Sequence, residues 1–172
     1  MFKIFGNIII LLSCTSIGLL MAWKYKVRVR QLKEIRGIFQ LIETEIFYTA
    51  TPILEVLEKV ARQASSPIAS IFKEIIGEIK RREGKTLGRI WCKAFERGRE
   101  NTGLTKEDLV PINYFGNILG TSDQESQIKN GKLVQSQLIK LEEGAEKDFI
   151  RNEKLFKNLG VLLGLTIVII LY

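Results

Sequence analysis

The chain has 172 residues, a formal net charge of +7, a hydrophobic fraction of 46% and no histidine. Without histidine, catalysis by a Ser-His or Cys-His pair is excluded. The basic residues alternate with glutamates and form no patch interleaved with aromatic residues, which argues against a nucleic-acid-binding protein.

Both ends of the chain are apolar, whereas the middle is charged. No charged residue occurs in the twenty positions from Ile4 to Trp23 or in the fifteen from Asn158 to Tyr172. About 20 apolar residues cross a bilayer core of roughly 30 Å as a helix. The second segment covers only roughly 22 Å, so it must thin the bilayer, use its flanks or pack on the first. We therefore predict transmembrane helices over 1–23 and 158–172 and a helical domain over 24–157.

Basic residues gather on the inner side of both apolar segments. They are Lys24, Lys26, Arg28, Arg30, Arg151, Lys154 and Lys157. Because Lys and Arg near membrane ends stay in the cytoplasm, we expect a two-pass protein of the cell membrane with the bulk of its chain in the cytoplasm. The cluster that follows the first segment would also be attracted to anionic membrane lipid, at about 1 kcal/mol per residue.

A cleaved signal peptide is the alternative interpretation of the amino-terminal segment. The apolar run is long for a signal peptide and ends in Trp23-Lys24 without a small-residue cleavage site. The sequence around Cys14 loosely resembles a lipoprotein box, but the apolar run continues to Leu20. Both features favour a retained membrane helix.

The first helix is expected to continue out of the membrane to about Thr49, with Gly37 as the weakest point. Its apolar row at helical spacing is Ile35, Phe39, Ile42 and Ile46. A second row beside it is Glu34, Ile38, Leu41 and Glu45.

Proline, glycine and capping residues divide the rest into shorter helices. Thr51-Pro52 and Ser66-Pro67 each predict an N-cap followed by proline at the first helical position. Gly84 is expected to close the second of these helices, and a further helix should run from Thr86 to about Asn101. Its expected buried side is Leu87, Ile90, Trp91, Ala94 and Phe95.

Two more helices complete the expected fold. Thr105 and Asp108 have capping-box spacing, and Pro111 predicts a kink or a restart near Val110. After Gly120, a capping box at residues 122–125 should start a last helix that runs to the carboxyl end. The prediction is an all-α, membrane-anchored antiparallel bundle of about six helices.

The segment Gly84-Lys85-Thr86 resembles the end of a phosphate-binding loop. Such a loop needs a further glycine where this chain has Ile79, and it follows a buried strand, so a turn is the better interpretation. Cys14 and Cys92 fall in different predicted compartments, so neither a disulfide nor a metal site is expected. Glu43 and Glu45 point about 160° apart on a helix and cannot act on one atom. No catalytic residue, cofactor or metal is therefore predicted.

The second apolar segment contains a GxxxG motif, Gly160 and Gly164, which permits close approach of another helix. Its expected partner is the first segment, where Cys14 and Gly18 have the same spacing. Homo-oligomerisation is the second interpretation of this motif.

Glu45 shares a row with apolar residues, so it either forms a salt bridge on the domain surface or contacts a partner protein. Glu43, on the side of Arg36, is expected to be solvated.

Several runs of residues resemble the stage III sporulation protein AB family over essentially the whole chain. They are Arg28-Val29-Arg30-Gln31-Leu32, residues 41–46 with Tyr48 and Thr51-Pro52, Leu119-Gly120 with Asp123 and Gln127, and residues 152–154 and 159–160. The family tends to have proline where this chain has Val29, and this difference favours a continuous helix.

The resemblance implies a membrane component of the channel or secretion-like complex between mother cell and forespore, located in the mother-cell membrane around the forespore. It also implies a helical domain similar to the platform proteins of type II secretion and type IV pili, and a cytoplasmic ATPase partner, the stage III sporulation protein AA. We hypothesise that Glu43, Glu45, Tyr48, Arg28 and Arg30 lie in or near the docking surface. The alternative is a structural anchor that only self-associates.

Overall fold

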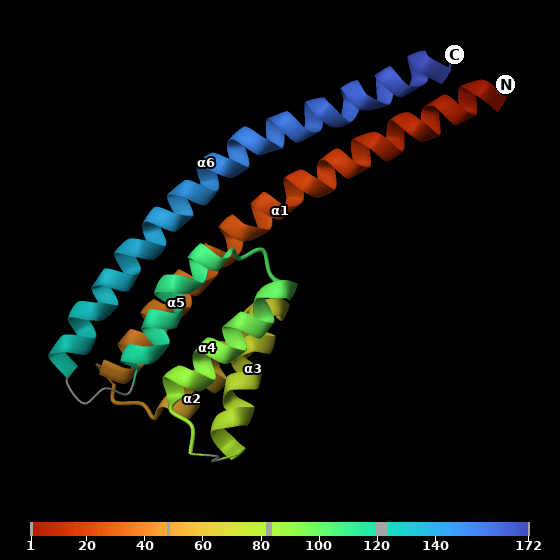
Figure 1. The fold of residues 1–172 in the computed structure, drawn as a ribbon. Helices are drawn as coiled ribbons and strands as arrows, with labels where there is room; N and C mark the ends of the chain where they lie inside the picture. The colour runs from red at the N-terminus through yellow and green to blue at the C-terminus, as the bar shows by residue number, and fades with distance from the viewer. Residues whose placement is uncertain (1, 48, 82–83, 120–123, 172) are drawn as a thin grey trace. The chain divides into compact units, whose positions relative to one another are not determined.

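The computed structural model describes the backbone of residues 2–47, 49–81, 84–119 and 124–171, without the side chains of 2–5, 7, 8, 11, 47, 124, 125 and 171. Over these residues the chain forms six α-helices, one 3₁₀ turn and no strand (Figure 1). They are α1 (Phe2–Phe47), α2 (Ile53–Gln63), α3 (Ser66–Arg81), α4 (Leu87–Gly98), η1 (Arg99–Asn101), α5 (Lys106–Ile118) and α6 (Gln124–Leu171). The predicted all-helical fold is confirmed.

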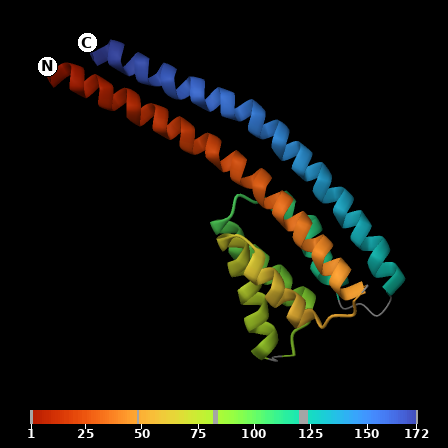
Figure 2. The same cartoon turned by 180° about the vertical axis from the view of Figure 1, so that it is seen from behind.

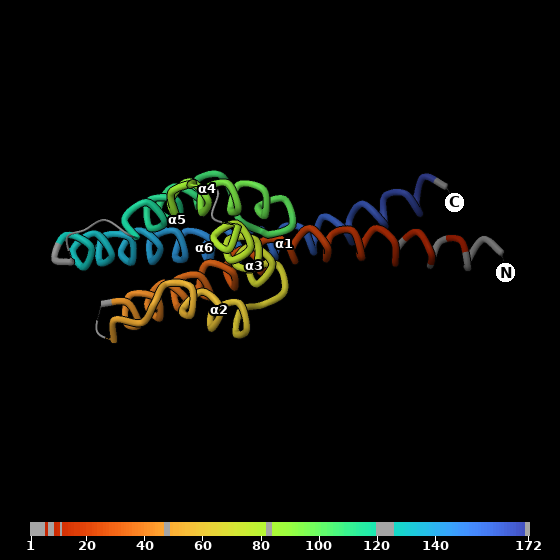
Figure 3. The backbone as a smooth tube through the Cα atoms, turned by 90° about the horizontal axis from the view of Figure 1, so that it is seen from below, coloured from red at the N-terminus to blue at the C-terminus, as the bar shows by residue number. Residues whose placement is uncertain are grey.

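The chain divides into two compact units, of which unit 1 comprises Met1–Val29 and Gly144–Tyr172. It therefore consists of the first part of α1 and the last part of α6, which run side by side (Figures 2 and 3). Large apolar side chains on both segments are exposed, among them Ile17, Leu20, Leu162 and Ile169. In the parts of the chain that the structure describes, we find no helix with both the length and the apolarity needed to cross a membrane.

Unit 2, residues Arg30–Glu143, is a helical bundle around an aromatic core. Phe39 of α1 stacks on Phe115 of α5 with ring centroids 4.0 Å apart. Trp91 lies between further rings and donates a hydrogen bond from Nε1 to the carbonyl of Ile112 at 3.0 Å. Among the side chains that the structure describes, the fully buried aromatic ones are Phe39, Phe72, Trp91, Phe95 and Phe115. Burying such side chains contributes about 1.5–3 kcal/mol each, so this cluster holds the bundle together.

The apolar rows expected from helical spacing are largely confirmed. Ile35, Phe39 and Ile42 are fully buried, while Ile46 is half-buried. Glu34 of the second row accepts hydrogen bonds from the amide and hydroxyl of Ser65, the latter at 2.7 Å. That carboxylate fixes the α2–α3 turn to α1.

Both proline start signals are misplaced by one residue. Pro52 occupies the N-cap position of α2 and makes no side-chain cap, because its ring carries no hydrogen-bond acceptor. The Thr51 hydroxyl, which was expected to cap this helix, bonds to the Glu45 carboxylate. In α3, Ser66 is already helical, and the carbonyl of Ser65 accepts the first helical bond at 2.7 Å.

The capping box predicted from Thr105 and Asp108 is confirmed on α5. Thr86, predicted only as the start of a helix, is the N-cap of α4 and accepts from the amide of Arg89. Gly84 has a φ of +70°, a conformation that suits glycine after the end of α3. The predicted stop at Gly120 and the capping residues Ser122 and Asp123 lie outside the described residues.

A kink or a restart was predicted near Val110, and the restart is wrong because α5 is a single helix with Pro111 inside it. Proline removes only one backbone hydrogen bond at this position, to the carbonyl four residues earlier. Leu109, Ile112 and Phe115 of the same helix are buried, and their packing outweighs that loss.

Candidate interaction surfaces

Glu45 lies at the carboxyl end of α1 and is held by groups within unit 2. Its carboxylate accepts hydrogen bonds from the Lys59 ammonium of α2, from Thr51 Oγ1 at 3.1 Å and from Thr49 Oγ1 at 3.4 Å. The hydrogen bond from Lys59 is the main cause of the lowered pKa of the Glu45 carboxyl. Of the two interpretations of Glu45, the structure shows the internal salt bridge, which ties α1 to α2.

The expectation that Glu43 is a solvated charge is wrong. Its side chain lies against the backbone of α6, where a Cβ built on Gly131 would be 2.3 Å from Glu43 Oε1. That oxygen is buried and has no hydrogen-bond partner. Oε1 of Gln135 is likewise buried and without a partner. Burial raises the pKa of the Glu43 carboxyl, against a smaller lowering by a hydrogen bond with Gln135. A glycine distant in sequence creates the space into which this glutamate fits.

The remaining proposed docking residues have different environments. Tyr48 lies outside the described residues. Arg28 belongs to unit 1 and forms an ion pair with Asp148 of α6 at 3.7 Å, with only 17% of its side chain exposed. Arg30 is exposed on α1 in unit 2. Of the four described candidates, only Arg30 presents its charge freely to solvent.

The residues predicted to pack the two apolar segments lie together in unit 1. A Cβ on Gly18 would be 2.5 Å from the carbonyl oxygen of Phe156, and one on Gly160 would be 2.9 Å from the carbonyl oxygen of Cys14. Gly164 is buried. The small residues therefore serve the contact between α1 and α6.

The Gly84-Lys85-Thr86 segment forms the turn between α3 and α4. Lys85 bonds to Glu78 at 3.0 Å, and Thr86 caps α4. Among the described side chains, no group of three or more His, Cys, Asp or Glu could hold a metal ion. Cys14 and Cys92 are both free thiols, and burial raises the pKa of Cys92, helped by the nearby charge of Glu96.

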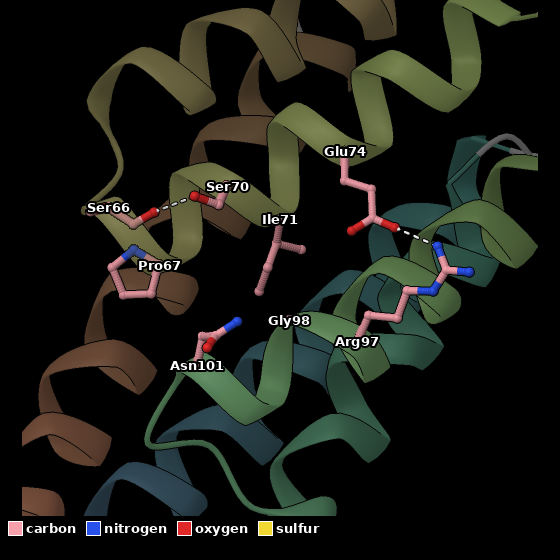
Figure 4. A pocket seen from close by; sticks show the side chains of 8 residues that line it. All are labelled: Ser66, Pro67, Ser70, Ile71, Glu74, Arg97, Gly98 and Asn101. Carbon is pink, nitrogen blue, oxygen red and sulfur yellow. Dashed lines mark hydrogen bonds and ion pairs between the residues drawn. The ribbon is translucent and has the colours of Figure 1, made fainter.

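A groove of about 550 Å³ between α3 and α4 in unit 2 was missed by the sequence reasoning. Its lining is Ser66, Pro67, Ser70, Ile71, Glu74, Arg97, Gly98 and Asn101. Figure 4 shows Ile71 and Gly98 at its centre and the Glu74–Arg97 ion pair, 3.0 Å long, at one end. The sequence indicated where α3 begins and roughly where α4 ends, but it did not indicate that these two segments lie side by side. We call it the α3–α4 groove.

These features define an all-helical protein with a groove between α3 and α4 and close helix–helix contacts within unit 1. The family model for stage III sporulation protein AB matches residues 3–172, and the chain belongs to this family. The resemblance inferred from the sequence is thereby confirmed.

Two relatives support the same assignment. The chain is 30% identical over 171 residues to the stage III sporulation protein AB of Bacillus subtilis (strain 168), with 99% of each chain covered. It is also similar to a solved structure of stage III sporulation protein AB, with a TM-score of 0.68 and 26% identity, covering 72% of this chain and 97% of that one. The protein is thus a sporulation protein, and neither name assigns it an enzymatic reaction.

Proposed function

We propose that the chain is a non-enzymatic membrane platform of the sporulation machinery, which binds a cytoplasmic ATPase through unit 2. The observation that carries this proposal is the family match over residues 3–172, because it includes both the apolar ends and the helical bundle. The ATPase is the stage III sporulation protein AA implied by the family resemblance. Within such a complex, this chain hydrolyses nothing and holds the ATPase at the membrane.

The membrane part of the proposal is supported by the surface of unit 1. Exposed apolar side chains occur along both of its helical segments, from Ile9 to Trp23 and from Leu155 to Ile170. Contiguous exposed apolar surface of this kind marks a site for lipid or protein. The charge pattern next to these segments favours a cytoplasmic unit 2.

Membrane attachment is tested by placing a charge on each part of α6. Leu162→Glu, in unit 1, should shift the full chain from the membrane pellet to the supernatant after alkaline extraction. Leu133→Glu is the matched control, because Leu133 is exposed on the same helix in unit 2. Release of the wild-type chain into the supernatant would remove the membrane from the proposal.

For the ATPase contact, the geometry favours the α3–α4 groove over the residues singled out in the sequence. The Glu45 carboxylate is already bound by Lys59 and Oε1 of the Glu43 carboxylate is buried, so neither is favoured for direct docking. Glu45 instead ties α1 to α2 within unit 2. Arg30 remains a direct-contact candidate, and Tyr48 is tested separately by substitution.

The docking proposal is tested by filling the groove. Ser70→Trp should abolish co-purification of the full-length chain with the ATPase in detergent. Ser136→Trp is the control, because Ser136 is also an exposed serine bonded to a carbonyl of its own helix. If Ser70→Trp binds as well as wild type, the groove is not the docking site; if wild type itself does not bind, the self-associating anchor becomes the better proposal.

A further inference from the structure

We propose that unit 1 binds the headgroup of an anionic phospholipid in a second groove, between α1 and α6. This groove has a volume of about 350 Å³, and every residue that lines it belongs to unit 1. The lining is Leu19, Ala22, Trp23 and Lys26 of α1 with Phe149, Glu153 and Lys157 of α6. We call it the α1–α6 groove. It combines apolar walls with two ammonium groups.

The charges of the groove fit a phosphate diester. Lys26 Nζ lies 5.4 Å from the centre of the Trp23 ring. Lys157 Nζ donates to the Glu153 carboxylate at 2.7 Å. A phosphate in the groove would accept hydrogen bonds from both lysines and would compete with Glu153 for Lys157. Glu153 therefore opposes the ligand, and its removal should strengthen binding.

A lipid fits the groove better than free phosphate does. Ala22 is only 4% exposed, so it lies at the bottom of the groove. Together with Leu19 and Phe149 it offers an apolar surface that a hydrated inorganic ion cannot use. Trp23, 56% exposed, is a residue type enriched where a membrane meets water. The inference rests on the proposed contact of unit 1 with lipid and is independent of ATPase docking.

The test measures phospholipid bound to the full chain in detergent by native mass spectrometry, with phosphatidylglycerol and phosphatidylcholine as probes. The wild-type chain should retain more phosphatidylglycerol than phosphatidylcholine. Lys157→Gln and Lys26→Gln should each weaken that binding about fivefold, the equivalent of about 1 kcal/mol per basic residue near anionic lipid. Glu153→Gln should strengthen it.

The matched control is Lys154→Gln, which removes the same charge from an exposed position of α6 outside the lining of the groove. Retained binding in this variant supports the groove, whereas a loss equal to that of Lys157→Gln overturns it in favour of diffuse attraction. Displacement of the lipid by soluble glycerol phosphate at equal concentration would show that the groove selects free phosphate and would also overturn the proposal. Membrane fractionation of the wild type separates failure of the groove from failure of membrane attachment.

Discussion

The Cα of Gly160 in α6 lies 3.4 Å from the position that a Cβ on Gly18 of α1 would occupy. The two helices of unit 1 can approach this closely only because neither residue has a side chain. Small residues commonly let membrane helices approach in this way.

Substitution of Gly18 by alanine should therefore destabilise unit 1 by about 1–3 kcal/mol, the usual cost of overpacking. The new methyl group would lie 2.5 Å from the carbonyl oxygen of Phe156. Thermal unfolding of the full chain in detergent, followed by circular dichroism, measures the effect. Gly6→Ala is the control, since nothing lies within 4 Å of a Cβ there. Gly160→Ala should lower the stability less in the Gly18→Ala background than in the wild type, because the close approach of α1 and α6 at Gly18 is already lost there.

A parallel comparison applies to the core of unit 2. A Cβ on Gly116 would lie 2.3 Å from Cγ of Trp91, whereas one on Gly77 meets nothing within 4 Å. Gly116→Ala should lower the free energy of unfolding by about 1–3 kcal/mol, while Gly77→Ala should raise it by about 0.5–1 kcal/mol through helix propensity. Denaturant unfolding distinguishes the two. If both substitutions changed the free energy of unfolding equally, Trp91 would have to move aside at no cost, which would contradict the prediction.

The salt bridge of Glu45 predicts a stability that depends on pH. Its pKa is lowered from 4.5 in the folded protein, so the contribution is fully present above that value and is lost as the pH falls through the folded value. Glu45→Gln should therefore melt at a lower temperature than wild type at pH 7, and the difference should disappear in acid. Glu143→Gln, at an exposed position of α6, is the control that removes one carboxylate elsewhere on the surface.

Glu43 should behave in the opposite sense. Its pKa is raised by burial, so the ionised form destabilises the fold at neutral pH, and this cost is relieved as the pH falls through the folded pKa. Glu43→Gln should raise the melting temperature at pH 7, because it removes the carboxylate charge that burial disfavours. The gain should shrink in acid. Melting curves of both proteins across this pH range provide the measurement, and a destabilised variant at pH 7 would contradict the prediction.

Cys92 should react slowly with maleimide. Its pKa is raised, first by burial and then by Glu96, so less thiolate is present at neutral pH than in an unfolded chain. In a Cys14→Ser background, labelling of the folded protein should be slower than labelling in denaturant, and it should accelerate with pH. Equal rates in both states would show that Cys92 is not shielded.

Much of the fold follows from local features of the sequence. The row of Ile35, Phe39 and Ile42 fixed the buried face of α1, and Thr105 with Asp108 fixed the start of α5. These signals are reliable because each depends on residues within a few positions of one another along one helix. Thr51 shows the limit of such signals, since the same hydroxyl could cap α2 or bond to Glu45, and only the fold selects the second.

The sequence by itself determined the uncharged ends, the helical periodicity between them and the family. Tertiary structure alone decided that Glu43 packs against Gly131, that α3 and α4 form one groove, and that Lys26 and Lys157 line another. The physical reason is that helical spacing reveals which side of a helix is apolar but not which residue of a distant helix faces it. That choice depends on the packing of all the helices together, because each close approach requires a small residue on one helix opposite a particular side chain on another.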